Sequence, residues 1–187
     1  MLPTGLLDLI AAIDACDESA RSLTSGLTDA QANWQPEGGT RWSIAQCLDH
    51  LARINAMYVA HFQTVVEAAR REGSGPFHGV HPTWLGRMFV RSLEPPPRQR
   101  LKAPTSVAPV SSIPIDVVLR DYLRSHDDYR RLVDACAAID VNRATGPNPF
   151  ARAVRMRVAT ALLVIPAHDR RHLWQAQQVR LASGFPG

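Results

Sequence analysis

The sequence predicts an all-α fold, a four-helix bundle with a long Pro-rich connection between helices two and three. Four segments carry apolar residues at helical spacing, and no segment shows a convincing strand alternation. One long stretch between the second and third of these segments is broken repeatedly by proline. With 187 residues, the chain is long enough for one domain with a proper core and short for two. We therefore expect a single domain over residues 1–187.

The first helix is expected in "TGLLDLIAAIDACDESARSLTSGL", where Gly26 stops it. A short helical turn and a Pro/Gly loop follow in "LTDAQANWQPEGGTR". The second helix is expected to begin at Ser43, because Ser43 and Gln46 have the S-x-x-Q spacing of a capping box. This helix should continue to about Arg71.

The connection from Gly73 to Pro114 is rich in proline, and only "WLGRMFVRSL" within it has a helical pattern. A connection of this length lets the chain cross the bundle instead of reversing tightly. The third helix, "IDVVLRDYLRSHDDYRRLVDACAA", should start directly behind Pro114.

The last helix is expected from roughly Arg157 to Ser183, with Gly184 as its terminator. Pro166 lies inside this helix. Since proline has no backbone N–H, a kink or an unsatisfied carbonyl at Leu162 should result.

The charge balance does not favour specific nucleic-acid binding. The formal net charge is +4 and the pI is near 9.4, but the cations are almost all arginines scattered among acids, with Lys102 the one lysine. The nearest approach to a basic patch, "ARAVRMRV", lacks stacking aromatic residues and any known DNA-binding motif. We expect an ordinary solvated face and no specific nucleic-acid partner.

The sequence gives no sign of membrane insertion or export. It contains no run of about 18 apolar residues, and its start carries Asp8 and Asp14 and no basic lead. Its cysteines, Cys16, Cys47 and Cys136, are far apart, odd in number and without a C-x-x-C pair, which argues against disulfides or a thiolate zinc site. A cytoplasmic protein with reduced thiols is the expectation.

Histidines interrupt the apolar stripes of two helices. In "PAHDRRHLWQAQQ", His168 and His172 occupy inward positions about 40° apart around the helix axis, so both can reach one ion from consecutive turns. His50 lies on the inward stripe of the second helix and could supply a third nitrogen from across the bundle. The spacing alone is a weak signal, because H-x-x-x-H pairs occur by chance and an inward histidine is usually a satisfied core residue.

Neighbouring residues offer alternatives for the ligand set. Cys47 could be a fourth ligand, although a small buried residue is the better interpretation. His126 lies on the stripe of the third helix and is the alternative ligand, although most such histidines are partly exposed. His61 is three turns from His50, roughly 16 Å along the axis, and cannot share its ion. His78 and His81 are placed in a solvent-facing loop.

Polar neighbours of the histidines have supporting roles or none. Gln175 could orient a ligand or touch substrate, or face water at the end of the bundle. Gln46 is one turn before His50, but the capping box already explains it. Arg171 could bind a substrate carboxylate, although a surface salt bridge is the favoured interpretation. Asp49 and Asp169 each adjoin a histidine and so point about 100° away from it, which makes them poor ligands and more naturally solvated.

The motifs also resemble a known family. "RWSIAQCLDHLA", followed about 120 residues later by "HDRRHLWQ", is similar to the DinB-like (DinB/YfiT) superfamily, in which a Trp-Ser helix start leads to one metal histidine and a C-terminal H-x-x-x-H helix carries two. The resemblance extends to "LTDAQANWQP", to the "NPF" turn and to the long connection. It implies a four-helix bundle with a divalent metal on His50, His168 and His172, and a homodimer.

A site with three neutral imidazoles leaves coordination positions for water or substrate, as in catalytic zinc sites. It would favour zinc, nickel or another late divalent ion. The resemblance implies a metal-dependent enzyme acting on a small-molecule substrate, by hydrolysis or by transfer of a low-molecular-weight thiol. The alternative is a non-catalytic metal-binding bundle that acts in stress response or as a dimeric scaffold.

Overall fold

The structure, a computed structural model, describes residues 1–97, 107–110 and 112–187. Lys102 and Pro104 of the predicted connection lie outside these ranges. The described residues form seven helices and two short strands: α1 (Thr4–Thr24), α2 (Asp29–Asn33), α3 (Pro36–Gly39), α4 (Ile44–Arg71), α5 (Trp84–Leu93), α6 (Ile115–Cys136), β1 (Thr145–Pro147), β2 (Arg155–Arg157) and α7 (Val158–Arg180).

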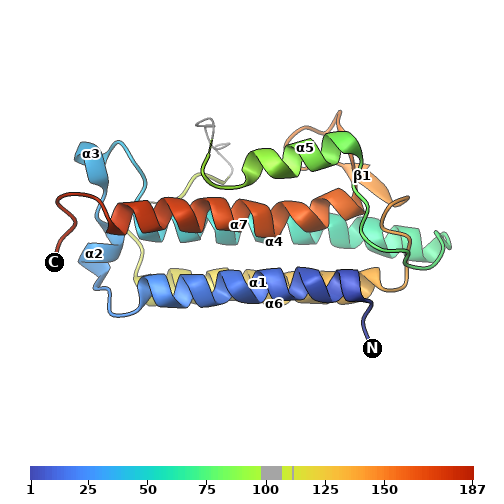
Figure 1. Cartoon of the computed structure of the whole chain (residues 1–187), viewed down its shortest axis with the longest axis horizontal. Coiled ribbons are helices and arrows are strands. Elements are labelled where there is room, and N and C mark those ends of the chain that lie inside the picture. Colours follow the sequence, from blue (N-terminus) through green and yellow to red (C-terminus); the bar gives the residue numbers. More distant parts are fainter. Residues whose placement is uncertain (98–106, 111) are drawn as a thin grey trace.

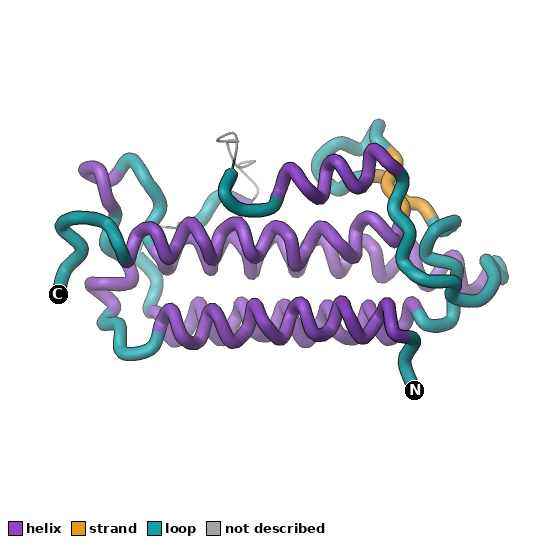
Figure 2. The backbone as a smooth tube through the Cα atoms, in the orientation of Figure 1, coloured by secondary structure: helices purple, strands orange, loops and turns teal. Residues whose placement is uncertain are grey.

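The four long helices form the bundle that the sequence predicts (Figure 1). Helix α4 packs against α6 and α7, and α1 also packs against α6 and α7. Helix α5 lies over α7, outside this four-helix arrangement (Figure 2). Its bounds, Trp84–Leu93, are those of the helical stretch expected within the connection.

The long connection sets the direction of α6. It returns the chain to the end of the bundle where α4 begins, so that α4 and α6 run parallel (Figure 1). At that end, the Asn33 side chain bonds both the backbone N–H and the carbonyl of Ile113, and Asp29 accepts from the N–H of Ile115. Helix α2 therefore fixes the start of α6.

The start of α4 has the capping box that its sequence predicts. The Ser43 hydroxyl accepts from the backbone N–H of Gln46 at 3.1 Å, and Gln46 Oε1 accepts from the backbone N–H of Ser43 at 3.0 Å. These bonds satisfy two of the N–H groups that a helix start leaves unpaired. They fix the first turn of α4, two turns before His50.

The fold is all-α, as predicted, apart from one short hairpin that the sequence does not indicate. Strands β1 and β2 pair antiparallel, with Gly146 opposite Met156. A Cβ at Gly146 would lie 2.5 Å from Val65 Cγ2, so the close approach of β1 to α4 requires glycine. Each strand has three residues, which is too short to show a period-two pattern.

Helix α7 continues through Pro166. The carbonyl of Leu162, which loses its helical donor to proline, accepts a hydrogen bond from the Tyr129 hydroxyl at 2.7 Å. The freed carbonyl is thus where the sequence predicts it, and α6 supplies its partner. The helix ends at Arg180, three residues earlier than expected, and Gly184 follows with φ of 87°.

Candidate metal centre

The three histidines of the predicted ligand set converge between α4 and α7. His50 faces His168 and His172 with ring centroids 5.3 and 4.7 Å away, and the latter two rings are 4.6 Å apart. One ring nitrogen of each lies within 4.8 Å of those of the other two. The helical spacing therefore brings all three imidazoles to one point, as expected from consecutive turns of α7.

His50 has a defined orientation. Its Nδ1 lies 2.7 Å from the carbonyl oxygen of Val107. A carbonyl can only accept, so Nδ1 carries the proton and donates, which leaves the lone pair of Nε2 free to ligate. Histidine ligands in metal proteins are commonly held in this way by a backbone carbonyl. The sequence carries no signal for this contact, because Val107 is 57 residues away in the connection.

The other two rings each have a nitrogen without a partner. Nδ1 of His168 and Nδ1 of His172 are buried and form no hydrogen bond among the described residues. Leaving a buried polar atom unpaired costs roughly 1–3 kcal/mol, so such atoms in a folded protein call for a reason. A cation bound among the three rings would supply one.

All three imidazoles are neutral at pH 7. Burial lowers the pKa of His168 to about 3, and repulsion from Arg171 and from the charge that His50 would carry when protonated adds to the effect. Burial, together with the same neighbours and His168, holds the pKa of His172 well below its usual range. Burial also lowers the pKa of His50, and the bond to Val107 opposes this only in part. Neutral imidazole is the form that binds a metal.

These residues fit a divalent metal. Tetrahedral ligands at 2.0–2.1 Å from zinc lie about 3.3 Å apart, so nitrogens within 4.8 Å need only side-chain rotation to reach that spacing. Imidazole ligands suit zinc, copper, iron and nickel. The group contains no carboxylate and no thiol among the described residues.

The comparison with protein families agrees with this geometry. A family model described as the DinB superfamily matches residues 12–176, which include all three histidines. The chain belongs to the DinB superfamily. No curated protein matches its sequence significantly.

Two side chains border the triad of this DinB-superfamily protein. The Trp42 ring stacks at 5.6 Å from His172 and lies 4.8 Å from His50. A side-chain hydrogen bond with Gln175 opposes the lowering of the His172 pKa only in part, and an orienting role for Gln175 stays a prediction. The side chain of Gln46 is engaged in its capping box, and a role for it at the metal stays a prediction.

The other histidines and Cys47 lie outside the group. His61 Nε2 is 2.7 Å from the carbonyl of Pro147, and His78 and His81 are exposed, as expected. Cys47 is fully buried in an apolar cluster with Ile44, Ala176 and Val179. The three cysteines are free and buried.

His126 differs from its prediction. It is 0% exposed instead of partly exposed, and both ring nitrogens are engaged: Nδ1 with Asp17 and Nε2 with Asp169, each at 2.5 Å. It therefore has no lone pair to offer and is not an alternative ligand.

The expectation that the neighbouring acids are solvated is wrong. Asp169 is 0% exposed because the side of α7 that it occupies packs on α6 and α4, whereas a period-based argument assigns it to water. Asp49 is buried because residues 107–110 cover α4. Its Oδ2 accepts from the backbone N–H of Val110 and from Arg53.

Arg171 is also buried, whereas the sequence favours a surface position. Its Nη1 donates to the carbonyl of Ser92 at 3.2 Å, and its charge is close enough to lower the pKa of both His168 and His172. Helix α5 reaches over α7 at this point, which the sequence does not reveal.

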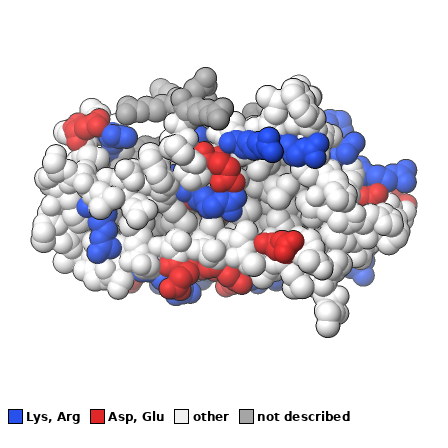
Figure 3. Space-filling model, viewed as in Figure 1, with Lys and Arg blue, Asp and Glu red and all other residues white. Residues whose placement is uncertain are grey.

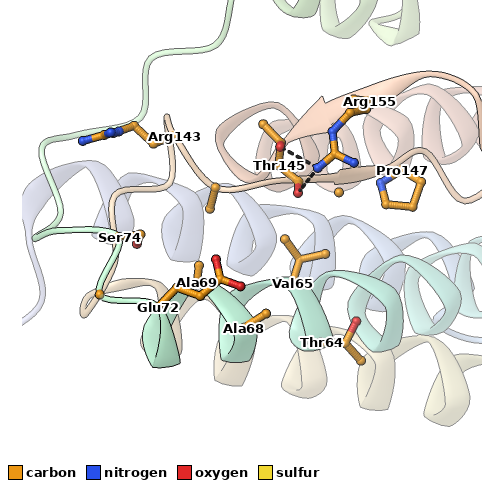
Figure 4. Close-up of a pocket in the computed structure, with 13 residues that line it drawn as sticks. Thr64, Val65, Ala68, Ala69, Glu72, Ser74, Arg143, Thr145, Pro147 and Arg155 are labelled. Carbon is orange, nitrogen blue, oxygen red and sulfur yellow. Dashed lines mark hydrogen bonds between the residues drawn. The ribbon is translucent and has the colours of Figure 1, made fainter.

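Two further cavities lie away from the triad. One of about 640 Å³ is between the end of α4 and β1, where Arg155 donates from one nitrogen to the carbonyl and hydroxyl of Thr145 (Figure 4). Thr64, the α4 residue of its lining that is nearest to His50 in sequence, is about 20 Å from His50 along the helix axis. The other, about 930 Å³, lies between α1 and α7 and includes Trp174. The lining of neither includes a triad histidine.

The surface bears on the predicted partners. On the face shown in Figure 3, basic side chains gather over α5, and elsewhere basic and acidic groups are interspersed. Among the described residues, no helix has the length and apolarity to cross a membrane. The absence of a specific nucleic-acid partner stays a prediction.

Proposed function

We propose that this DinB-superfamily protein is a metal-dependent enzyme that binds one divalent ion, zinc or nickel, through His50, His168 and His172. The observation that carries this proposal is the convergence of three neutral imidazoles, two of which, His168 and His172, have a buried Nδ1 without a hydrogen-bond partner among the described residues. Three protein ligands leave at least one coordination position for water or substrate, the arrangement of a catalytic zinc site.

The surroundings of the triad favour an anionic ligand at the open position. The described ligand group contributes no negative charge, so its three neutral imidazoles leave the charge of a bound divalent ion uncompensated. A divalent ion in this setting lowers the pKa of a bound water or thiol. The reaction we propose is therefore hydrolysis of a small molecule or transfer of a low-molecular-weight thiol to an electrophile.

A non-catalytic metal-binding bundle, acting in stress response or as a dimeric scaffold, is the second candidate. The packing of Trp42 against His50 and His172 favours it, because an aromatic ring beside the ion restricts access. The two proposals differ in whether a small thiol can reach the metal.

The ligand set is tested by substitution. We expect His50→Ala, His168→Ala and His172→Ala each to abolish stoichiometric zinc or nickel binding, measured by elemental analysis and calorimetry. His61→Ala is the matched control, since it lies on the same helix as His50 and should retain full binding. Full metal content in the His50 variant would contradict the triad.

Access to the ion is tested with cobalt. We expect a small thiol added to the Co²⁺-loaded protein to produce a sulfur-to-cobalt charge-transfer band, which the His168→Ala variant should not show. A spectrum of the Co²⁺-loaded wild-type protein that does not change with added thiol, with an anion that competes with bound water, or with pH would favour the non-catalytic candidate.

A further inference from the structure

The carboxylate of Asp169 joins three of the four long helices, α7, α6 and α4. It lies on α7 directly after His168, and Nε2 of His126 on α6 is 2.5 Å from its Oδ2. From α4, Asn55 donates to both of its oxygens at 3.2 and 3.3 Å. The Tyr122 hydroxyl adds a longer contact of 3.4 Å.

The fourth helix joins through the other side of the same imidazole. Nδ1 of His126 is 2.5 Å from Asp17 on α1, and Arg130 holds the second oxygen of Asp17 at 2.6 Å. Since carboxylates accept, both ring nitrogens donate, and the ring is an imidazolium between two anions. Burial alone would lower the pKa of His126, but the two carboxylates overcome it and raise this pKa to about 9.

Helix α7 needs such an anchor where the triad lies. Pro166 removes one backbone hydrogen bond two residues before His168, which weakens the mechanical connection between the two halves of the helix. Tyr129 anchors the half before the proline, through the carbonyl of Leu162. Asp169 anchors the half that carries both histidines.

We propose that the network of Asp17, His126 and Asp169 is a positioning device, which fixes the rotation of α7 so that His168 and His172 face His50. This inference rests on the proposed metal binding by the triad. It assigns a role in metal affinity to His126, a residue that is outside the ligand group and lines neither cavity described above.

The direction in which metal affinity changes in a His126 variant distinguishes a positioning role from an electrostatic one. Replacing His126 by glutamine removes a positive charge near the metal, so charge alone would strengthen binding of a cation. Both N–H groups of a glutamine side chain are on one nitrogen, whereas His126 donates from two nitrogens on opposite sides of its ring, so glutamine cannot reproduce both bonds and a lost anchor would weaken binding. The two explanations therefore give opposite outcomes for one variant.

The experiment measures Co²⁺ affinity and visible spectrum for wild type, His126→Gln, Asp17→Asn and Tyr129→Phe, with circular dichroism as the check on folding. We expect His126→Gln to weaken binding about 10- to 100-fold and to alter the d–d bands, as loss of a ligand's supporting partner does. Asp17→Asn keeps an oxygen acceptor at a partly exposed position, so it should fold in any case and weaken binding about threefold or more.

Tyr129→Phe is the control, because it removes another buried bond between α6 and α7, on the far side of Pro166. It should lower the melting temperature and leave the affinity and spectrum unchanged. Folded His126 or Asp17 variants with wild-type affinity and spectrum would overturn the inference and leave the proposed function intact. A wild-type protein that binds no Co²⁺, Zn²⁺ or Ni²⁺ would overturn both.

Discussion

His126 and His172 are both buried, yet their pKa values move in opposite directions. Burial, two neighbouring imidazoles and Arg171 hold the pKa of His172 far below its usual range, so its ring stays neutral. His126 is as deeply buried, but the two carboxylates at its nitrogens raise its pKa to about 9. The partners of each ring decide whether it can be a metal ligand or an anchoring cation.

The raised pKa of His126 makes the stability of the metal-free protein depend on pH. The folded state keeps its proton up to about pH 9, whereas an unfolded histidine loses it near pH 6.5. The stabilisation is therefore fully present below pH 6.5 and is lost as the pH rises toward 9, with an upper bound of about 3 kcal/mol. Urea unfolding of the metal-free protein between pH 6 and 9 measures this loss.

Asp17→Asn isolates the contribution of His126 from that of other titrating groups. Removing one carboxylate lowers the folded pKa of His126, so the unfolding free energy of this variant should change less over the same pH range. Parallel pH profiles for the variant and the wild type would contradict the imidazolium assignment.

At the scale of elements, α7 depends on contacts from α6 before its histidines and from α5 between them. Tyr129 satisfies the carbonyl that Pro166 leaves free, and the carbonyl of Ser92 at the end of α5 holds Arg171. The sequence predicts both helices, α5 with its exact bounds, because helical period and caps are local properties. It does not predict where α5 lies, because that depends on a close contact between distant residues.

That close contact occurs at Gly86. A Cβ there would lie 2.5 Å from Oγ1 of Thr160, a buried and β-branched side chain of α7 that has little freedom to move. In the wild-type background, we expect Gly86→Ala to lower the unfolding free energy by about 1 kcal/mol, since overpacking exceeds the gain in helix propensity.

In a Thr160→Ala background the clash is removed, and the same substitution should instead stabilise the protein by up to about 1 kcal/mol. Thermal or urea unfolding of the four proteins of this cycle measures both values. An effect of Gly86→Ala that is equal in the two backgrounds would contradict the docking of α5 on α7 through Gly86.

At the scale of the whole molecule, the sequence predicts the bundle and the triad, but not what surrounds them. The helical period places His50, His168 and His172 on inward stripes, and the resemblance to the DinB-like superfamily implies that they form one ligand set. The burial of Asp169 could not be predicted. The position next to His168 on α7 would face solvent in an isolated amphipathic helix, but in this bundle it is buried at a helix interface. The contact of Val107 with His50 could not be predicted either, because the connection has no hydrophobic period from which its path could be derived.

The bundle should not need the metal in order to fold. Its main apolar cluster, with residues such as Ile13, Phe62, Tyr129 and Leu162, forms without the triad. We expect the chelated protein to keep its helical circular dichroism, and saturating metal to add a few kcal/mol through binding linkage. The His168→Ala variant should show no such shift in melting temperature. Loss of helix on chelation would instead indicate a structural metal site.

X-ray absorption spectroscopy of the zinc-loaded protein tests the open three-histidine site most directly, because it identifies and counts the atoms bound to the ion. We expect three imidazoles at about 2.0 Å, one or more additional oxygen ligands from solvent, and no sulfur. A zinc–sulfur distance of about 2.3 Å, or fewer than three imidazoles, would contradict it.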